Sequence, residues 1–461
     1  MVIVKEYLPR PQKGAEPPEI SGKDWYGLMK RTATRALAVL LAVFFVFAGV
    51  PLRAFAIDAP PDVFSETYIV FDRETGQAII GKDMHKKMYP ASITKVLTVA
   101  LVMERHQMNE QITVTESMIA GIDPESSHIA LAEGEQVTVE EMVYATMLYS
   151  ANDAANVLAE YDAGTLDAFV WKMNNKAKEL GAVNTNFMNA NGLHDDDHYT
   201  TAYDFALILQ WALTVKGFEE VFGAAEYDME ATNLNEERHF GTDDCLTVTS
   251  EYTYEGAVGG KLGWTPQASH TFVSAAERED MSLIFVSLST PTQWDKFKDA
   301  VALYDYVFDN YKKTAVSTST AEIPTSVPVG EVENPTESIT FRVPSELKVD
   351  IPSDDTGEGL TVKHNLPQFY LDKKDLSPQL SVYNGEDLLY SVPMEYQVAV
   401  VTAPVSAPQP EEGGESPLWP ILKGLLTVVV VLALLCVVFF LALCVLRYRN
   451  LARRRRNQNR R

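Results

Sequence analysis

The sequence predicts a mixed α/β domain, followed by a small all-β domain and one transmembrane helix. Strand-like runs enclose several helix-periodic segments between residues 66 and 312, and short alternating stretches fill 337–402. A run of 22 residues at 425–446, apolar except for one threonine, is long enough to span a membrane. Strands at both ends of the first domain, with helices between them, favour one antiparallel sheet flanked by helices.

The first 56 residues are predicted to be an export signal with a long N-terminal region. Basic residues precede an apolar run over 38–50, and Ala54-Phe55-Ala56 supplies the small-x-small pattern of a cleavage site. The run is short for a membrane span, so we expect cleavage after Ala56, with an uncleaved signal anchor as the alternative. Residues 57–65 are expected to be a linker.

The apolar run at 425–446 indicates a membrane anchor. In a helix it is about 33 Å long, enough to cross the hydrocarbon core of a bilayer. Residues 447–461 carry eight arginines and no acidic residue. By the positive-inside rule this tail is cytoplasmic, so we expect a single-pass cell-membrane protein whose folded domains lie outside the cytoplasm.

Charge and cysteine content narrow the function classes. The formal net charge is −24 although both ends of the chain are basic, so the segment between them is strongly acidic. Such a surface argues against nucleic acid as a partner. Cys436 and Cys444 lie in the predicted span, which leaves Cys245 alone outside it. An exported domain with one thiol has no internal disulfide and depends on its hydrophobic core.

Local patterns place the expected elements in order. "TYIVFDRETGQAII" is a hairpin with a polar turn ending in Gly76, and a second hairpin turns at 277–280. Helical periodicity occupies 92–106, 138–161, 165–180, 201–215 and 293–311. Serine, threonine and proline mark a linker at 313–336 and a stalk at 403–424. Within the β domain, Asn384-Gly385 favours a tight hairpin turn.

The stretch "MYPASITKVLTVALVMERH" contains the first candidate chemistry. Ser92 and Lys95 are three residues apart, which places both side chains on one face of a helix. A serine hydroxyl becomes a nucleophile when a base takes its proton, and a lysine serves as that base only if its pKa is lowered. The same spacing at Ser345–Lys348 lies in the β domain with no apolar helix behind it, so we interpret it as a chance match.

Two further stretches carry polar residues that suit a cleft. In "TMLYSANDAANVLAEYDAG", Ser150 and Asn152 lie where one helical run ends and another starts. They are suited to proton relay and to binding an amide carbonyl, although a helix N-cap is the simpler interpretation. In "AVGGKLGWTP", two glycines precede Lys261 at a strand start. That lysine is suited to anchoring a carboxylate, with a solvated edge-strand lysine as the alternative.

Ser-x-x-Lys, Ser-x-Asn and Lys-x-Gly in this order resemble the signature of the penicillin-binding proteins and serine β-lactamases. The chain over about 66–311, with its trailing β domain, is similar to the low-molecular-weight D-alanyl-D-alanine carboxypeptidases. The resemblance is carried by "IVFDRETGQAIIGKDMHKKMYPASITK", "SSHIALAEGEQVTVEEMVYATMLYSANDAANVLAE" and "MNNKAKELGAVNTNFMNANGLHDDDHYTTAYDFALIL".

The resemblance implies a role for each motif. Ser92 forms the acyl-enzyme after Lys95 takes its proton, and Ser150 transfers protons. Asn152 binds the substrate amide, and Lys261 binds the terminal carboxylate.

The reaction implied is removal of the terminal D-alanine from peptidoglycan stem peptides, without a cofactor or metal. β-Lactam antibiotics are the covalent inhibitors implied by the same resemblance. The oxyanion hole implied consists of the backbone N–H groups of Ser92 and Trp264.

The third motif departs from the family pattern. Leu262 stands where the family has threonine or serine, so a hydroxyl that hydrogen-bonds the substrate carboxylate is missing. Losing such a bond costs about 1.5–3 kcal/mol, and Thr265 in "GWT" is expected to compensate in part. Leu262 keeps open the alternative of a non-catalytic wall-binding scaffold. A DD-endopeptidase that cuts cross-links also stays open, because its catalytic groups would be the same.

Two other candidates carry less weight. The "HDDDH" stretch, His194 to His198, resembles a metal cluster, but its position after Asn191-Gly192 favours a polar loop. Cys245 is not expected to be a nucleophile, because its surroundings do not resemble a cysteine-protease site.

Overall fold

The computed structural model describes residues 59–331, 334–370, 372 and 376–400. Contacts divide the chain into two compact units. The larger holds the described residues up to Ala321 with Ser345–Lys363 and Ser381–Val392, and the smaller holds Glu322–Pro344, His364–Leu380 and the described residues from Pro393 onward.

The predicted export signal, stalk, membrane span and basic tail lie outside the described residues. Within the described ranges, every helix is too short or too polar to span a bilayer.

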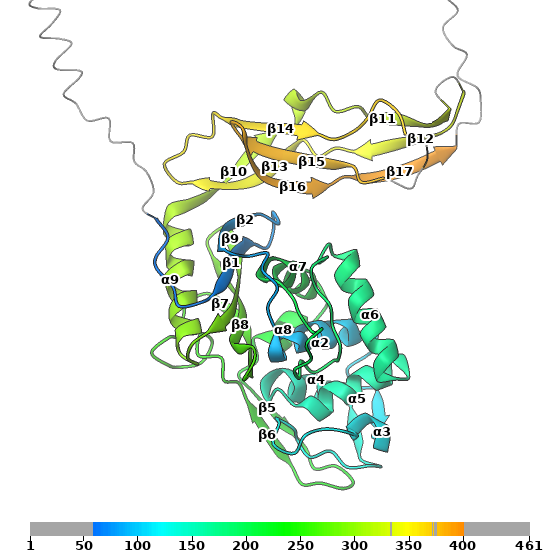
Figure 1. Ribbon diagram of the computed structural model, residues 1–461, viewed down its shortest axis with the longest axis vertical. Helices are drawn as coiled ribbons and strands as arrows, with labels where there is room; N and C mark the ends of the chain where they lie inside the picture. The colour runs from blue at the N-terminus through cyan, green and yellow to red at the C-terminus, as the bar shows by residue number, and fades with distance from the viewer. Residues whose placement is uncertain (1–58, 332–333, 371, 373–375, 401–461) are drawn as a thin grey trace, which may run out of the picture. The chain divides into compact units, whose positions relative to one another are not determined.

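The larger unit is built on a five-stranded antiparallel sheet that joins the two ends of the predicted α/β domain (Figure 1). Its strand order is β2–β1–β9–β8–β7, so β1 pairs with β9 although more than 200 residues separate them. The prediction of one antiparallel sheet flanked by helices is confirmed. The strands are β1 (Thr67–Asp72), β2 (Ala78–Lys82), β7 (Ala257–Thr265), β8 (Ser269–Arg278) and β9 (Met281–Thr290).

Alternate residues of each strand enter two hydrophobic cores, one on each face of the sheet. From β1, Ile69 and Phe71 pack with the helices α2 to α8, whereas Tyr68 and Val70 pack beneath α9. This alternation follows from the two-residue period of a strand. The helices are α2 (Lys95–Met103), α3 (Glu116–Ile119), α4 (Val139–Leu148), α5 (Asn152–Ala163), α6 (Leu166–Glu179), α7 (Ala202–Ala212), α8 (Phe218–Phe222) and α9 (Asp295–Asn310).

Two predicted helices have a different form. The first starts as a 3₁₀ turn, η1 (Ala91–Thr94), before α2 begins. The second, predicted over 138–161, is two helices, because Ser150 between α4 and α5 has a φ of 58°. A residue in the left-handed region cannot continue a right-handed helix.

Two small two-stranded sheets were not predicted from the sequence, because strands of three or four residues carry little periodicity. They are formed by β3 (Gln111–Thr113) with β4 (Gln136–Thr138), and by β5 (Glu226–Met229) with β6 (Arg238–Gly241).

The C-terminal described part is all-β, as expected, but begins earlier than predicted. The segment 313–336 was expected to be a linker, yet it contains most of β10, the short 3₁₀ turn η2 and all of β11. Three sheets form here, β10–β13, β11–β12–β17 and β14–β15–β16. Their elements are β10 (Tyr311–Ser317), η2 (Ser319–Ala321), β11 (Ser326–Glu331), β12 (Asn334–Arg342), β13 (Glu346–Pro352), β14 (Leu360–His364), β15 (Gln379–Asn384), β16 (Asp387–Pro393) and β17 (Glu395–Val400).

The hairpin between β15 and β16 turns at the predicted Asn384-Gly385 pair. Gly385 has a φ of 62°, a conformation that glycine adopts at no steric cost.

Candidate active site

Ser92 lies in the 3₁₀ turn that precedes α2, and Lys95 is the first residue of the helix. The Nζ atom of Lys95 lies 3.0 Å from the Oγ atom of Ser92, as the three-residue spacing predicts. Ala91, immediately before Ser92, has a φ of 52°. This left-handed conformation costs a non-glycine residue of order 1–3 kcal/mol and tends to occur at functional sites.

Lys95 is fully buried, and the acceptors it contacts are uncharged. Besides Ser92, its Nζ atom donates to Asn152 Oδ1 at 2.7 Å and to the carbonyl oxygen of Asn191 at 2.5 Å. Burial lowers the pKa of Lys95 well below 10.5, and the positive charge of Lys261 lowers it further, with Asp153 acting in the opposite direction. Lowering the pKa of a lysine favours its neutral amine, which can accept a proton from a serine hydroxyl.

Ser150 and Asn152 enter the site from the break between α4 and α5. The left-handed backbone at Ser150 ends α4, and its Oγ atom lies 3.1 Å from Lys261 Nζ. Asn152 begins α5 and contacts Lys95 as described. The N-cap position belongs to Ala151, which has no capping side chain, so the simpler interpretation of Ser150 as an N-cap is wrong.

Lys261 lies on β7, at the edge of the sheet, but its side chain is buried rather than solvated. Its Nζ atom donates to Ser150 Oγ and, at 3.0 Å, to the carbonyl oxygen of Leu262. Burial lowers the pKa of Lys261 to about 7, and nearby Lys296 lowers it while Asp243 raises it. The alternative interpretation as a solvated edge-strand lysine is therefore wrong.

Two glycines allow the backbone to approach the nucleophile from opposite elements. A Cβ atom at Gly263 on β7 would lie 2.8 Å from the Ser92 nitrogen. A Cβ atom at Gly192, where φ is 84°, would lie 2.0 Å from the Ala91 carbonyl oxygen. Only glycine fits at either position, so the chain passes directly beside the Ser92 amide that the expected oxyanion hole uses.

These groups open onto a cleft of about 920 Å³. Ser92, Ser150, Asn152, Lys261, Trp264 and Thr265, the predicted site residues apart from Lys95, all line it. Trp264 is 58% exposed. Thr265 Oγ1 accepts a hydrogen bond from the Ala268 amide at 3.0 Å. Leu262 also lines the cleft, so the position of the missing hydroxyl faces the site.

The sequence did not reveal two contributors to the site. One is the Asn191 carbonyl, an acceptor for Lys95, since Asn191-Gly192 predicts only a turn. The other is Lys296 near the start of α9, which lines the cleft and is 3% exposed. Burial lowers the pKa of Lys296 to about 8, opposed by the charges of Cys245, Asp243 and Asp244. No motif spacing indicates a lysine 35 residues beyond Lys261.

The histidine-rich loop has a structural role at this site. Among the described residues, no group of three histidine, cysteine or acidic side chains is arranged to hold a metal ion. His198 is buried, and its Nε2 atom lies 3.0 Å from Thr94 Oγ1, beside the nucleophile. Burial lowers the pKa of His198 to about 4, so it is neutral at pH 7. Cys245 lines the cleft, but burial raises its thiol pKa, which disfavours the thiolate.

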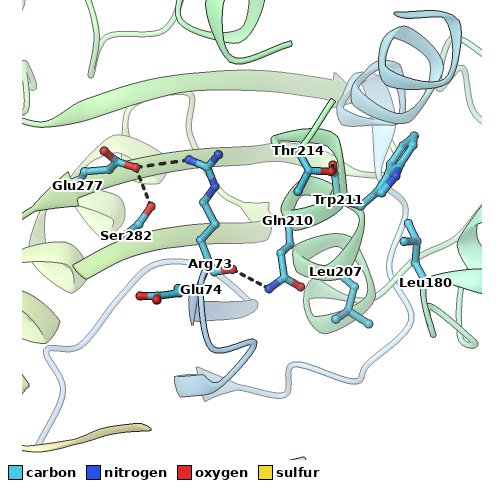
Figure 2. A pocket seen from close by; sticks show the side chains of 9 residues that line it. All are labelled: Arg73, Glu74, Leu180, Leu207, Gln210, Trp211, Thr214, Glu277 and Ser282. Carbon is cyan, nitrogen blue, oxygen red and sulfur yellow. Dashed lines mark hydrogen bonds and ion pairs between the residues drawn. The ribbon is translucent and has the colours of Figure 1, made fainter. Parts of the chain in front are cut away.

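A second hollow, of about 480 Å³, lies away from these groups (Figure 2). Arg73 occupies one side of it and pairs with Glu277, which also accepts from Ser282. Gln210 from α7 donates to the Arg73 carbonyl oxygen at 2.7 Å. Because Arg73 neutralises the Glu277 carboxylate that Ser282 contacts, that carboxylate is a weak base, and we assign the catalytic chemistry to the larger cleft.

The group within reach of the Ser92 hydroxyl is a lysine amine and not an imidazole, so fold and site define a serine hydrolase of the Ser–Lys kind. Residues 54–292 match the D-alanyl-D-alanine carboxypeptidase family of peptidases, S11, and the chain belongs to that family.

Individual relatives agree with this assignment. The D-alanyl-D-alanine carboxypeptidase DacF of Bacillus subtilis is 30% identical over 54% of this chain and 63% of its own length. DacB2 of Mycobacterium tuberculosis is 31% identical over 54% of this chain and 84% of its own. The chain thus spans less than two thirds of the Bacillus protein. Penicillin-binding protein 5 of Haemophilus influenzae shares the fold, with a TM-score of 0.58, 22% identity, and coverage of 74% of this chain and 98% of that one.

The pKa of Lys261 predicts how acylation of Ser92 by benzylpenicillin depends on pH. The second-order rate constant should rise as Lys95 loses its proton. It should fall again above pH about 7, as Lys261 loses the charge that attracts the inhibitor's carboxylate. Lys261→Arg keeps a permanent charge, so the rate constant should fall only at higher pH. Lys172 pairs with Asp162 on α5, and the control substitution Lys172→Arg should leave the pH dependence unchanged. Stopped-flow measurements would contradict this if the wild-type rate constant stayed level up to about pH 9.

Proposed function

We propose that the protein removes the terminal D-alanine from peptidoglycan stem peptides through an acyl-enzyme on Ser92. The contact that carries this proposal is that of the buried Lys95 amine with the Ser92 hydroxyl, at 3.0 Å. The other two acceptors of that amine are an amide oxygen and a backbone carbonyl, so its hydrogen bonds include no carboxylate that would hold its proton. A lysine in this state is prepared to act as a general base.

In the proposed acylation, Ser92 Oγ attacks the carbonyl carbon between the two D-alanines as its proton moves to Lys95. The carbon–nitrogen bond then breaks, and the leaving D-alanine nitrogen receives a proton through Ser150, which lies 3.1 Å from Lys261 Nζ. Water attacks the resulting ester, releases the shortened peptide and restores the Ser92 hydroxyl. β-Lactams would form the same ester and hold it, because their leaving nitrogen stays attached.

Two buried cations are proposed to hold the substrate's terminal carboxylate. Lys261 and Lys296 are each 3% exposed, and both line the cleft. A charged group of opposite sign between them would relieve their mutual repulsion and offset part of the cost of burying them. Leu262 lacks the hydroxyl of the family pattern, so this chain depends more on charge, and less on hydrogen bonding, to hold the carboxylate.

The chain is further proposed to be exported and anchored in the cell membrane by residues 425–446, with its catalytic unit outside the cytoplasm. The apolar length of that segment and the arginines behind it support this location. A substrate in the cell wall also requires the cleft to lie outside.

The first prediction for this function concerns the nucleophile. Benzylpenicillin should add one penicilloyl group per protein, detected by intact-mass spectrometry, and Ser92→Ala should abolish the adduct. Ser126→Ala removes another serine that lines the cleft and should leave the adduct intact. A wild-type protein that forms no adduct would contradict the proposal and favour the wall-binding scaffold.

The second prediction concerns the altered third motif. Leu262→Thr should raise kcat/KM for a pentapeptide ending in D-Ala-D-Ala about tenfold or more, because it restores a hydrogen bond to a carboxylate. Leu193→Thr places a hydroxyl elsewhere in the same cleft and should give no such gain. Unchanged kinetics in Leu262→Thr would show that this explanation of the leucine is wrong.

The third prediction concerns location. Protease added to intact cells should release a folded fragment that contains residues 59–400 and should leave the arginine tail protected. Immunoblots against each end of the chain would detect the two parts. A tail that is digested while the catalytic unit is protected would reverse the proposed orientation.

A further inference from the structure

Exposed tryptophan side chains form part of the cleft lining, called here the aromatic wall. Trp264 on β7 is 58% exposed and Trp294, just before α9, is 46% exposed, and both line the cleft. Tyr252 stacks on Trp294, with ring centroids 6.2 Å apart, which holds that indole in place. Leu262 adds an aliphatic side chain to the same wall. Large apolar surfaces gathered in a cleft indicate contact with an apolar part of a ligand.

The neighbouring lysines identify which end of the substrate meets this wall. Trp264 follows Lys261 by three residues, and Trp294 precedes Lys296 by two. In the proposed function these lysines hold the terminal carboxylate, so the side chain of the leaving residue lies beside the two indoles. The single methyl group of D-alanine covers only a small part of that surface.

The rest of the cleft has a different chemical character. Residues 123–127, which line it from the segment before Ile129, contribute two carboxylates and two serine hydroxyls. The amides of Ile129 and Leu131 donate to Asp153 at the start of α5, which fixes this segment against the helix. Tyr149 and Leu193 add further apolar surface to the cleft, but both exposed indoles that line it lie close in sequence to the two lysines.

We propose that the leaving-group subsite takes a D-amino acid whose side chain is apolar and larger than a methyl group. This inference rests on the proposed function and names its preferred substrate class. It also accounts for Leu262: this cleft-lining position carries a four-carbon apolar side chain where the family has a hydroxyl-bearing one. A substrate of this class recovers through side-chain contact what it loses in hydrogen bonding to its carboxylate.

The test compares two stem pentapeptides that differ only in the last residue, D-Ala-D-Ala and D-Ala-D-Phe, using the full-length protein in detergent. We expect kcat/KM to be about tenfold higher for the D-Phe peptide, since small differences in apolar contact change kcat/KM by about this much. Trp294→Ala should lower the D-Phe to D-Ala ratio about tenfold. Trp171→Ala, which removes an indole that is 68% exposed on α6, should leave the ratio unchanged.

Several outcomes would overturn the inference. A ratio at or below one in the wild type would do so, as would a ratio that Trp294→Ala does not change. Preferential cleavage of a cross-linked dimer, with no preference for D-Phe, would assign the aromatic wall to a neighbouring peptide instead.

Binding to Ser92→Ala separates this inference from the proposed function. If the wild type cleaves neither peptide, the proposed function fails, and calorimetry on the Ser92→Ala variant still measures the subsite. About tenfold tighter binding of the D-Phe peptide, lost when Trp294→Ala is added, would support the subsite. Equal binding of the two peptides would overturn it.

Discussion

The burial of one lysine amine among uncharged acceptors is the constraint on which the rest of the site depends. An ammonium group taken out of water without a counter-ion is costly, so the equilibrium shifts toward the neutral amine. Burial and the charge of Lys261 produce this shift at Lys95, whose uncharged partners come from three separate segments: Ser92 beside it, Asn152 on α5 and the Asn191 carbonyl. The helical core must hold all three within hydrogen-bond distance, which links catalysis to packing. A shift of about 1 Å in any segment would let water reach the amine and raise its pKa.

The nucleophile's backbone is confined from two sides, and this confinement keeps a strained conformation in place. Ala91 has a positive φ, and such strain persists only where the surroundings over-determine it. A Cβ atom at Gly192 would overlap the Ala91 carbonyl, and one at Gly263 would crowd the Ser92 amide, so both positions require glycine. On β8, Thr271 donates to the Pro90 carbonyl at 2.7 Å. The turn that presents Ser92 is thus held by contacts that are distant in sequence.

The sequence could predict what short spacing determines. Ser92 and Lys95 are one helical turn apart, and the distance between them follows from helix geometry. The two faces of the sheet followed likewise from the alternation of residues such as Ile69 and Val70. The part that escaped prediction is long-range. Lys296 lines the cleft because the chain passes through β8 and β9 before α9 begins. No local sequence pattern predicts that this lysine lies in the same cleft as Lys261.

The sequence also predicted some element boundaries wrongly, for a related reason. The segment 313–336 has the composition of a linker, but β10 within it finds a partner in β13, and strand pairing outweighs composition. The break between α4 and α5 depends on the backbone of Ser150, whose left-handed φ places its hydroxyl beside Lys261. Helical periodicity continues across that break, so the apolar pattern alone predicts one helix. The prediction of a single helix therefore fails at Ser150, a residue of the candidate site, as is expected where a site imposes backbone strain.

Two lysines in one cleft make carboxylate binding depend on protons as well as on contacts. Burial lowers the pKa of Lys261 to about 7 and that of Lys296 to about 8, so near neutrality neither is fully charged in the free protein. An anion between them favours the charged forms and raises both pKa values, so binding takes up protons. This coupling is strongest at neutral to weakly alkaline pH, because the free lysines have lost part of their protons there and the bound anion restores them. A chain with Leu262 in its third motif has lost a neutral hydrogen-bond donor, and its hold on the carboxylate is therefore more sensitive to pH than that of a relative with a hydroxyl there.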